Sequence, residues 1–481
     1  MFAGGRLRRS VCAPIAVLAI AGLATFALPS IAFAEAAANT TTVSKGTVLS
    51  LDDVVKNWST LTPFQQLTAV DQMITGGAVD QAEALLTGTH YTAENDKITQ
   101  RFFLARIAQA RGQNDEAIAS YRDILVQHPE FSRVRMELAT TLFQTQDDEA
   151  ARHHLDLVLG DTASNPNLAN TVRSYINAID GRRLWDASAY ITIAPSTNFN
   201  QGSDASTIFL TGPDGKPLPF TLDKGNVKQS GIGIAAGLQA SYRQPVTDQL
   251  DIIASGGINT KTFKDGDFND ALFNVSVGPR LRFEWGYLGL YGLAEQRFYA
   301  NDFYYNSYGG LLSSTVRLGP QDIVFGDFSC SQRDFESDWK GSDLRYQNGT
   351  LCGIGGRFEH AFDSSTLVRV LGSVGRERTT LDHLNNDTWS VGAGLGSEMP
   401  WGVSIYTQAL YTSREHDGIY PGAGVRRSDD RWDFSVNLTK RDWIMFGMAP
   451  QIQYTYTLND STVPFFNYDA HSVNLTLTKR F

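Results

Sequence analysis

The sequence predicts two dissimilar domains: an N-terminal all-α tetratricopeptide-repeat array, followed by a 14-stranded antiparallel transmembrane β-barrel. Three observations predict this multidomain fold. The composition changes near Trp185, because 33 of the 43 glycines follow that residue. Before it, apolar residues recur with helical spacing and a period of 34 or 35 residues, whereas after it they alternate with period two. The connections between the alternating segments are short and long in turn, which is typical of a membrane barrel.

The length, the net charge and the mean hydropathy exclude several classes of protein. The chain has 481 residues and a formal net charge of −10, which argues against nucleic acid as a partner, since nucleic-acid binding usually needs a basic face. The mean hydropathy of −0.22 is too polar for a bundle of membrane helices. The length favours two or more domains.

The only long apolar run lies at the N-terminus and predicts a signal peptide over residues 1–34. Arg6, Arg8 and Arg9 form a positive leading region, and an apolar stretch over 11–34 ends in the small-residue pattern Ala32-Phe33-Ala34. A transmembrane anchor is the alternative, because 24 apolar residues are long enough to span a bilayer. With cleavage, the chain matures outside the cytoplasm, where disulfides are permitted.

Residues 35–185 predict a periplasmic tetratricopeptide-like helical domain. Ala82, Ala117 and Ala151 are spaced 35 and 34 residues apart, and small residues at this period let paired helices approach closely. The segment 112–121 with the following Pro129 matches half of such a repeat. We count two clear repeats, a weaker one before them and a closing helix near 167–183, about the minimum for a stable array.

The first helix of each repeat pair is expected to line a concave face. A groove for a partner segment is one interpretation of that face, and packing against the β domain is the other. By register the client-groove candidates are Phe102, Arg106, Gln109, Met136, Thr140 and Phe143.

Residues 186–481 predict an outer-membrane β-barrel. Around 273–285, Phe273, Val275 and Val277 share one face, and polar residues such as Asn274 and Ser276 share the other. One face suits lipid and the other a wet lumen. Fourteen segments of this kind begin near residues 187, 230, 250, 270, 287, 304, 322, 349, 366, 387, 403, 430, 444 and 471.

The connections are sorted by length. Those after even segments are short, and those after odd segments are mostly longer and polar, including 200–229, 334–348 and 416–429. Short periplasmic turns and long outer loops produce this alternation, which a soluble sandwich does not require. With an even number of strands, both ends of the barrel chain face the periplasm.

Several apparent motifs are weak. Gly392-Ala-Gly394-Leu-Gly396 resembles a phosphate loop but lacks a following helix, so strand glycines explain it better. The run 265–270 has calcium-ligand residue types without the downstream glutamate of an EF-hand, and His153-His154 point to different sides of a helix. We therefore predict no catalytic, cofactor-binding or metal-binding residues, and no enzyme activity.

Cys330 and Cys352 flank the predicted outer loop 334–348, each 11 residues from its centre at residue 341. This spacing places them opposite one another on adjacent strands. Together with the oxidising compartment it predicts a Cys330–Cys352 disulfide.

A signal peptide, a short tetratricopeptide array and a fourteen-stranded barrel together resemble the surface lipoprotein assembly modifier (Slam) family of Gram-negative bacteria. Local segments are also similar to that family's: Pro195-Ser-Thr-Asn198-Phe-Asn200, the closing region from Arg431-Trp-Asp433 to Pro450, and the terminal Lys479-Arg480-Phe481. The resemblance covers nearly all of the mature chain.

The resemblance implies a translocator in the Gram-negative outer membrane, with the helical domain in the periplasm, that delivers a client surface lipoprotein or secreted protein. It also implies outer-membrane lipid, the barrel-assembly machinery and periplasmic chaperones as partners, no cofactor, and Phe481 as a barrel assembly signal. The alternative is a polysaccharide exporter of the tetratricopeptide-porin type, which a lumen of one charge sign would favour. A passive porin does not explain the helical domain.

Overall fold

The computed structural model describes residues 55–162, 165–182, 184–211, 216–363, 365–440, 443 and 448–480. The predicted signal peptide and Phe481 lie outside the described residues. Within those residues, no helix has both the length and the apolar character needed to span a membrane.

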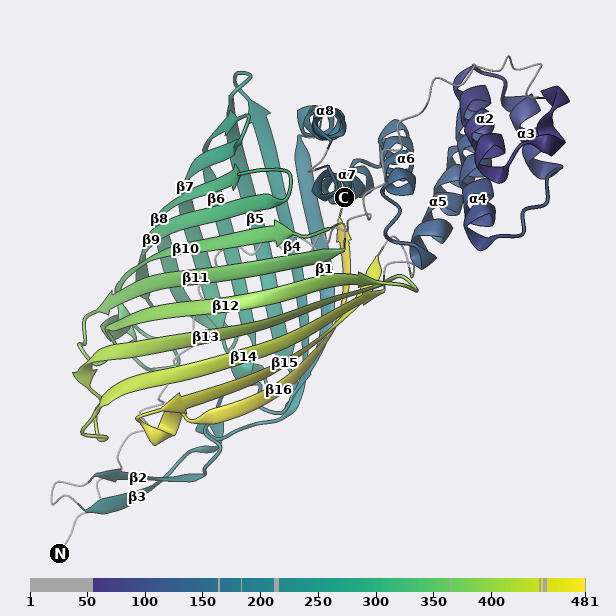
Figure 1. Ribbon diagram of the computed structural model, residues 1–481. Helices are drawn as coiled ribbons and strands as arrows, with labels where there is room; N and C mark the ends of the chain where they lie inside the picture. Colours follow the sequence, from purple (N-terminus) through teal and green to yellow (C-terminus); the bar gives the residue numbers. More distant parts are fainter. Residues whose placement is uncertain are drawn as a thin grey trace, which may run out of the picture.

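The helical domain has seven α-helices among the described residues, arranged as three antiparallel pairs and a closing helix (Figure 1). Their bounds are α2 Pro63–Thr75, α3 Val79–Thr87, α4 Glu94–Ala110, α5 Asn114–Gln127, α6 Ser132–Gln144, α7 Asp148–Gly160 and α8 Pro166–Arg182, after a short 3-10 turn, η1 Trp58–Thr60. This arrangement confirms the predicted tetratricopeptide-like array.

The repeat period has a physical basis in both the turns and the core. Gly77, Gly112 and Gln146 each end the first helix of a pair with a positive φ, of 84°, 79° and 63°, the left-handed conformation that closes a helix C-terminus. The alanines at the same period, Ala82, Ala117 and Ala151, are all fully buried between helices. A capping box between Thr62 and Gln65 starts α2.

Fourteen described strands close into one antiparallel barrel, in the order β1-β16-β15 and on down to β4, which pairs with β1. This confirms the predicted strand number. The bounds are β1 Trp185–Ser196, β4 Gly231–Pro245, β5 Leu250–Phe263, β6 Asp270–Phe283, β7 Gly286–Tyr299, β8 Asp302–Arg317, β9 Asp322–Phe335, β10 Gly349–Ala361, β11 Thr366–Thr379, β12 Asn386–Met399, β13 Val403–Ile419, β14 Arg426–Lys440, β15 Ala449–Ser461 and β16 Tyr468–Arg480.

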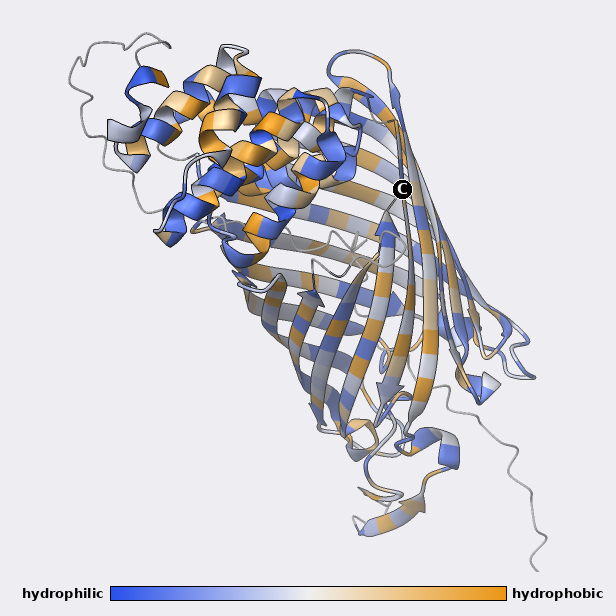
Figure 2. Cartoon of the chain, turned by 90° about the vertical axis from the view of Figure 1, so that its right-hand side faces the viewer, coloured by the Kyte–Doolittle hydropathy of each residue, from blue (hydrophilic) through white to orange (hydrophobic). Residues whose placement is uncertain are grey.

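The alternating residues separate as a membrane barrel requires. Outward apolar side chains such as Val275, Val277 and Leu290 are 52% to 59% exposed on the outer wall. Figure 2 shows the alternation of apolar and polar residues along the strands. The polar residues between them face the lumen, where many pair with one another.

The two rims of the barrel differ. We call the rim that carries the helical domain the turn end, because it has the short connections 246–249, 284–285, 318–321, 362–365 and 400–402. We call the opposite rim the loop end. At the loop end β13 and β14 extend further than predicted, so the predicted loop 416–429 shrinks to 420–425. At the turn end β15 is described from Ala449, and its predicted start near 444 lies outside the described residues.

A hairpin at the loop end was not predicted. Within the connection 197–230, β2 Thr207–Thr211 pairs with β3 Pro217–Thr221 and stands away from the barrel (Figure 1). The prolines Pro217 and Pro219 hide its signal, because proline lacks the N–H that a strand donates.

Candidate functional site

The helical domain lies at the turn end of the barrel (Figures 1 and 2), and α6, α7 and α8 each contact a barrel strand there. From α6, Arg135 pairs with Glu398 near the end of β12. From α7, Asp156 lies 3.7 Å from Arg317 at the end of β8. At α8, the main-chain oxygens of Asp180 and Gly181 accept hydrogen bonds from Arg243 near the end of β4.

The three receiving strands are spread around the rim. In the strand order, β8 lies four strands from β4 and four from β12, so β4 and β12 are eight strands apart one way and six the other. They are therefore on nearly opposite sides of a fourteen-stranded ring. The helical domain bridges the mouth of the barrel at the turn end.

The contact between Arg135 and Glu398 is a buried ion pair. Arg135 Nη2 lies 3.1 Å from Glu398 Oε2, and each side chain is 2% exposed. The same nitrogen donates a 2.6 Å hydrogen bond to the main-chain oxygen of Pro129. Breaking such a pair on one side is costly, because it leaves the other charge buried without compensation.

A second buried carboxylate organises the contact at α8. Asp251 on β5 is fully buried, with a carboxylate oxygen 3.3 Å from Arg243, 3.0 Å from Arg280 and 3.1 Å from Arg282. Arg243 thereby has one end held by Asp251, while its other end donates to Gly181 O at 3.2 Å. Because cations stabilise helix C-termini, this arrangement fixes the end of α8 on the barrel.

The inner face of the helical array carries a charge ladder across its first helices. Arg106 on α4 pairs with Asp71 on α2 and with Glu137 on α6 at 3.5 Å, and Arg133 on α6 pairs with Asp71 at 2.8 Å. Burial alone would raise the pKa of Asp71, but the hydrogen bond from Arg133 and the charges of both arginines hold that pKa below its usual range. The ladder locks the three first helices together.

The six client-groove candidates lie in different environments. Phe102 is 5% exposed and belongs to the helical core. Gln109 accepts a 2.9 Å hydrogen bond from Tyr121, and Thr140 donates one of 3.0 Å to the main chain of Glu137. Phe143 packs edge-on against Tyr175 and under the guanidinium of Arg182. Arg106, Gln109, Met136, Thr140 and Phe143 keep partly exposed side chains.

Charges of both signs pair along the lumen wall. Glu359 lies 2.6 Å from Arg369 and 3.0 Å from Arg357, and Asp433 lies 2.8 Å from Arg431. The lumen therefore lacks the single charge sign that would favour a polysaccharide exporter.

Sequence reasoning missed the residues that hold the two domains together. No role was predicted for Arg135, Glu398, Asp251 or Arg243. The available signal was an arginine between the core positions Val134 and Leu138 of a helix, and a glutamate after a row of inward glycines on β12.

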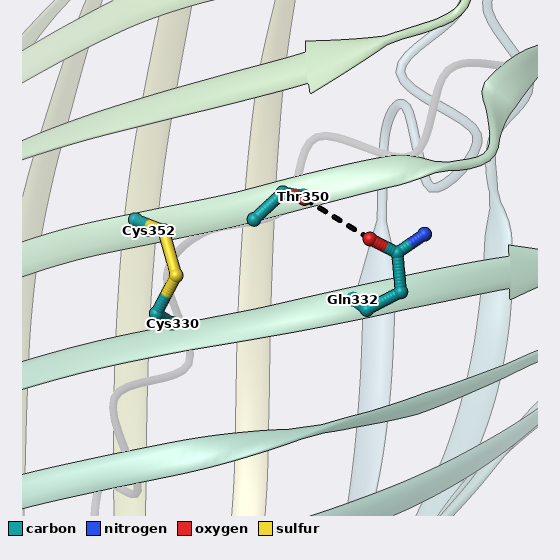
Figure 3. Close-up of a disulfide and its surroundings, with 4 residues drawn as sticks. All are labelled: Cys330, Gln332, Thr350 and Cys352. Atoms are coloured by element: carbon teal, nitrogen blue, oxygen red, sulfur yellow. Dashed lines mark hydrogen bonds between the residues drawn. A yellow bond between two sulfur atoms is a disulfide. The ribbon is translucent and has the colours of Figure 1, made fainter.

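Cys330 and Cys352 are joined. Cys330 on β9 and Cys352 on β10 are direct register partners and form a disulfide with a Cα–Cα distance of 4.0 Å (Figure 3). They share the outward face with the exposed Phe328 and Ile354. Thr350 and Gln332 lie two residues from these cysteines, towards the loop end of the same strands. Thr350 donates a 3.0 Å hydrogen bond to Gln332.

Labelling of thiols in the purified, unreduced protein tests this disulfide. Unreduced protein unfolded in denaturant is expected to take up no maleimide reagent at Cys330 or Cys352, and to take up two equivalents after reduction. Two freely reactive thiols before reduction would contradict the bond. The Cys330→Ser/Cys352→Ser protein, treated in parallel, provides the background labelling.

In the run 265–270, which has calcium-ligand residue types, one aspartate forms an ion pair. A carboxylate oxygen of Asp267 lies 2.9 Å from Lys340 Nζ. Within the described parts of the chain, no group of three or more His, Cys, Asp or Glu residues is placed to hold a metal ion.

Comparisons with known proteins match both domains. Residues 185–481 match the family described as "Surface lipoprotein assembly modifier", and residues 62–155 match its N-terminal tetratricopeptide repeats. "Hemophilin secretion modulator" of Acinetobacter baumannii is 24% identical, covering 80% of this chain and 79% of the relative. "Surface lipoprotein assembly modifier 1" of Neisseria meningitidis serogroup B is 24% identical, covering 91% of this chain and 86% of the relative.

Among solved structures, the crystal structure of a Pseudomonas aeruginosa FadL homologue matches with 8% identity and a TM-score of 0.39, covering 62% of this chain and 90% of that one.

Proposed function

Because the chain belongs to the surface lipoprotein assembly modifier family, we propose that it delivers a client protein across the outer membrane. The protein is an outer-membrane β-barrel with its helical domain on the periplasmic side, so the turn end is the periplasmic rim. Its relatives act in surface lipoprotein assembly and hemophilin secretion, as their names state. The client of this chain is accordingly a surface lipoprotein or a small secreted protein.

The single observation that supports this proposal most is the position of the helical domain. Its grip on β4, β8 and β12 holds the array across the periplasmic mouth of the barrel. A client bound by the array is thereby held next to the lumen. A free-standing array on a flexible tether would not supply this proximity.

The inner face of the array is the proposed binding surface. Its first helices are locked side by side by the ladder of Asp71, Arg106 and Glu137, so the face is rigid before a client arrives. Preorganised surfaces bind at a lower entropic cost. The partly exposed Met136 and Thr140 lie on this face beside Glu137.

The barrel is the proposed passage or insertion platform. Its wall is apolar outside and lined with paired charges inside, and transfer through it needs no covalent step. We further propose that the barrel-assembly machinery inserts this protein, and that periplasmic chaperones bring the client to it.

Deleting the protein tests the proposed function directly. The deletion strain is expected to lose one or a few specific proteins from its surface or medium and to accumulate them in the periplasm, with other outer-membrane proteins unchanged. Quantitative proteomics of the surface, periplasm and medium measures this. If the deletion strain kept the same surface proteins as the parent strain but lacked an exported polysaccharide, protein delivery would be contradicted.

Charge placed on the inner face should block client capture. In Met136→Glu/Thr140→Glu, two carboxylates on α6 would have to be desolvated by any client that covers them. We expect export to fall several-fold while the barrel keeps its folded, heat-modifiable migration on gels. Ala119→Glu/Arg122→Glu adds the same number of glutamates to exposed positions of α5 and should export normally; equal losses in both variants would contradict a role for the inner face.

A further inference from the structure

The lumen holds two adjoining cavities near its loop end. The first, of about 300 Å³, lies against β8, β9, β11, β12 and β13, and the second, of about 260 Å³, lies against β5, β7 and β14. They share Arg297, Tyr304, Phe465 and Phe466 as lining residues. The first volume falls at the lower end of the range typical of small-molecule sites.

Two arginines in these walls each keep one hydrogen-bond donor without a partner. Arg333 Nη1 lies 3.1 Å from Glu377, but among the described residues its Nη2 has no acceptor. Arg427 donates to Asp429 through Nε and Nη2, and its Nη1 likewise has none. The two side chains are only 8% and 3% exposed, so an unmade hydrogen bond there is costly.

Among the charged lining residues, cations outnumber carboxylates. A third arginine, Arg414, forms no ion pair with a described residue and donates only to Thr388, at 3.2 Å. Two lining residues are acidic, Asp270 and Glu377. Six are cationic: Lys261, Arg297, Arg333, Arg376, Arg414 and Arg427. Such a surface attracts an oxyanion, for which guanidinium groups are the preferred partners.

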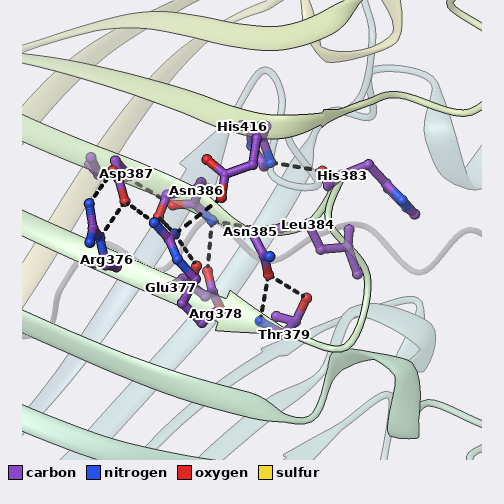
Figure 4. A network of polar contacts seen from close by, with 12 residues as sticks. Arg376, Glu377, Arg378, Thr379, His383, Leu384, Asn385, Asn386, Asp387 and His416 are labelled. Atoms are coloured by element: carbon purple, nitrogen blue, oxygen red, sulfur yellow. Dashed lines mark hydrogen bonds and ion pairs between the residues drawn. The ribbon is translucent and has the colours of Figure 1, made fainter.

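His416 adds an acceptor to this set of donors. Its Nδ1 lies 3.0 Å from the main-chain oxygen of His383 (Figure 4), so Nδ1 carries the proton and Nε2 keeps a lone pair. The ring is buried, and Nε2 has no partner among the described residues. An acceptor beside cationic donors suits a ligand that has a hydroxyl group as well as a negative charge.

Aromatic side chains form much of the remaining wall. Tyr304, Tyr305 and Phe335 contact one another on the β8–β9 side, and Phe465 and Phe466 lie opposite, from the β15–β16 connection. Flat apolar surfaces with a few convergent polar groups are the usual composition of a small-molecule site.

We propose that the two adjoining cavities together form a binding site for a small acidic sugar. Its phosphate or carboxylate is attracted by Arg333 and Arg414 of the first cavity and by Arg427 of the second, and its hydroxyl donates to His416. The site lies near the loop end, at the opposite end of the lumen from the helical domain. It does not depend on protein delivery being correct, because binding is measured on the isolated protein.

Calorimetric titration of the full-length protein in detergent tests this site with four probes. Glucose 6-phosphate and glucuronate should bind, whereas glucose should not. Inorganic phosphate should bind more weakly than glucose 6-phosphate, because it lacks the sugar hydroxyls and ring. In Arg427→Gln and Arg333→Gln, affinity for both acidic sugars should fall about 10- to 100-fold, the loss expected for one hydrogen bond to a charged group.

Two further variants make the result specific. His416→Leu should weaken glucose 6-phosphate and leave inorganic phosphate unchanged. Arg345→Gln, at an exposed arginine of the 336–348 loop that pairs with Asp343, should bind like the unmodified protein. Heat-modifiable migration checks that each variant has folded.

Several results would overturn the proposal. These are no binding of either acidic sugar, equal binding of glucose, inorganic phosphate binding as tightly as both acidic sugars, or folded Arg333 and Arg427 variants with unchanged affinity. An equal loss in Arg345→Gln would also overturn it, since the effect would then not belong to the cavity.

Discussion

Replacing Arg135 with alanine should release the helical domain from the β12 side of the barrel. The substitution removes the cation that lies 3.1 Å from the buried Glu398 carboxylate, and one-sided loss of a buried ion pair typically costs about 3–5 kcal/mol. It also removes the 2.6 Å hydrogen bond from Arg135 to the main-chain oxygen of Pro129. We expect faster proteolysis between α8 and β1, faster hydrogen exchange in α6, and reduced client export.

A paired variant separates the lost ion pair from general damage. In Arg135→Met/Glu398→Leu both charges of this pair are removed, and apolar replacement of a whole buried pair is often neutral. Proteolysis and exchange should therefore return most of the way to those of the unmodified protein. Arg345→Ala, which removes an exposed cation, should have little effect. The role assigned to this pair fails if Arg135→Ala resists protease as the unmodified protein does.

Replacing Asp251 with asparagine should destabilise both the barrel rim and the seat of α8. The carboxylate is fully buried and faces Arg243, Arg280 and Arg282, so its neutralisation removes the negative charge that these three guanidinium groups share. We expect a loss of about 3–5 kcal/mol, by analogy with other broken buried ion pairs. Arg243 also loses the group that orients it towards the C-terminus of α8.

Two measurements follow the two consequences of Asp251→Asn. The temperature at which the barrel loses its compact migration on gels should fall, and hydrogen exchange should rise at the C-terminal turn of α8. Asp343→Asn, in the exposed 336–348 loop, is the matched control and should change neither. Unchanged exchange at α8 in a folded Asp251→Asn protein would show that Arg243 holds the helix without this carboxylate.

The sequence was informative wherever a local period determines structure. Side chains of a strand alternate between two faces, so the polar and apolar residues of 273–283 already indicated which face is the lumen and where β6 lies. The spacing of Ala82, Ala117 and Ala151 likewise indicated the helix pairs, because each alanine occupies the same close contact in its repeat. Boundaries were less accurate at β13 and β14, where strand residues continue into the expected loop 416–429.

The candidate site was less predictable. Register placed Phe102 on the inner face of the array, whereas packing buries it in the core. The β2–β3 hairpin was hidden by its prolines, and the unpartnered donors of Arg333 and Arg427 depend on which side chains meet across the lumen.

By itself, then, the sequence determined an array of helix pairs followed by a fourteen-stranded barrel, since both follow from periods of 34, 3.6 and two residues that neighbouring positions reveal. Only the tertiary structure decided how the two domains meet. Arg135 and Glu398 are 263 residues apart in the chain, and neither belongs to a repeating pattern that would indicate the other. Their pairing exists because the docking of two rigid domains brings two isolated charges together and removes the water that would otherwise separate them.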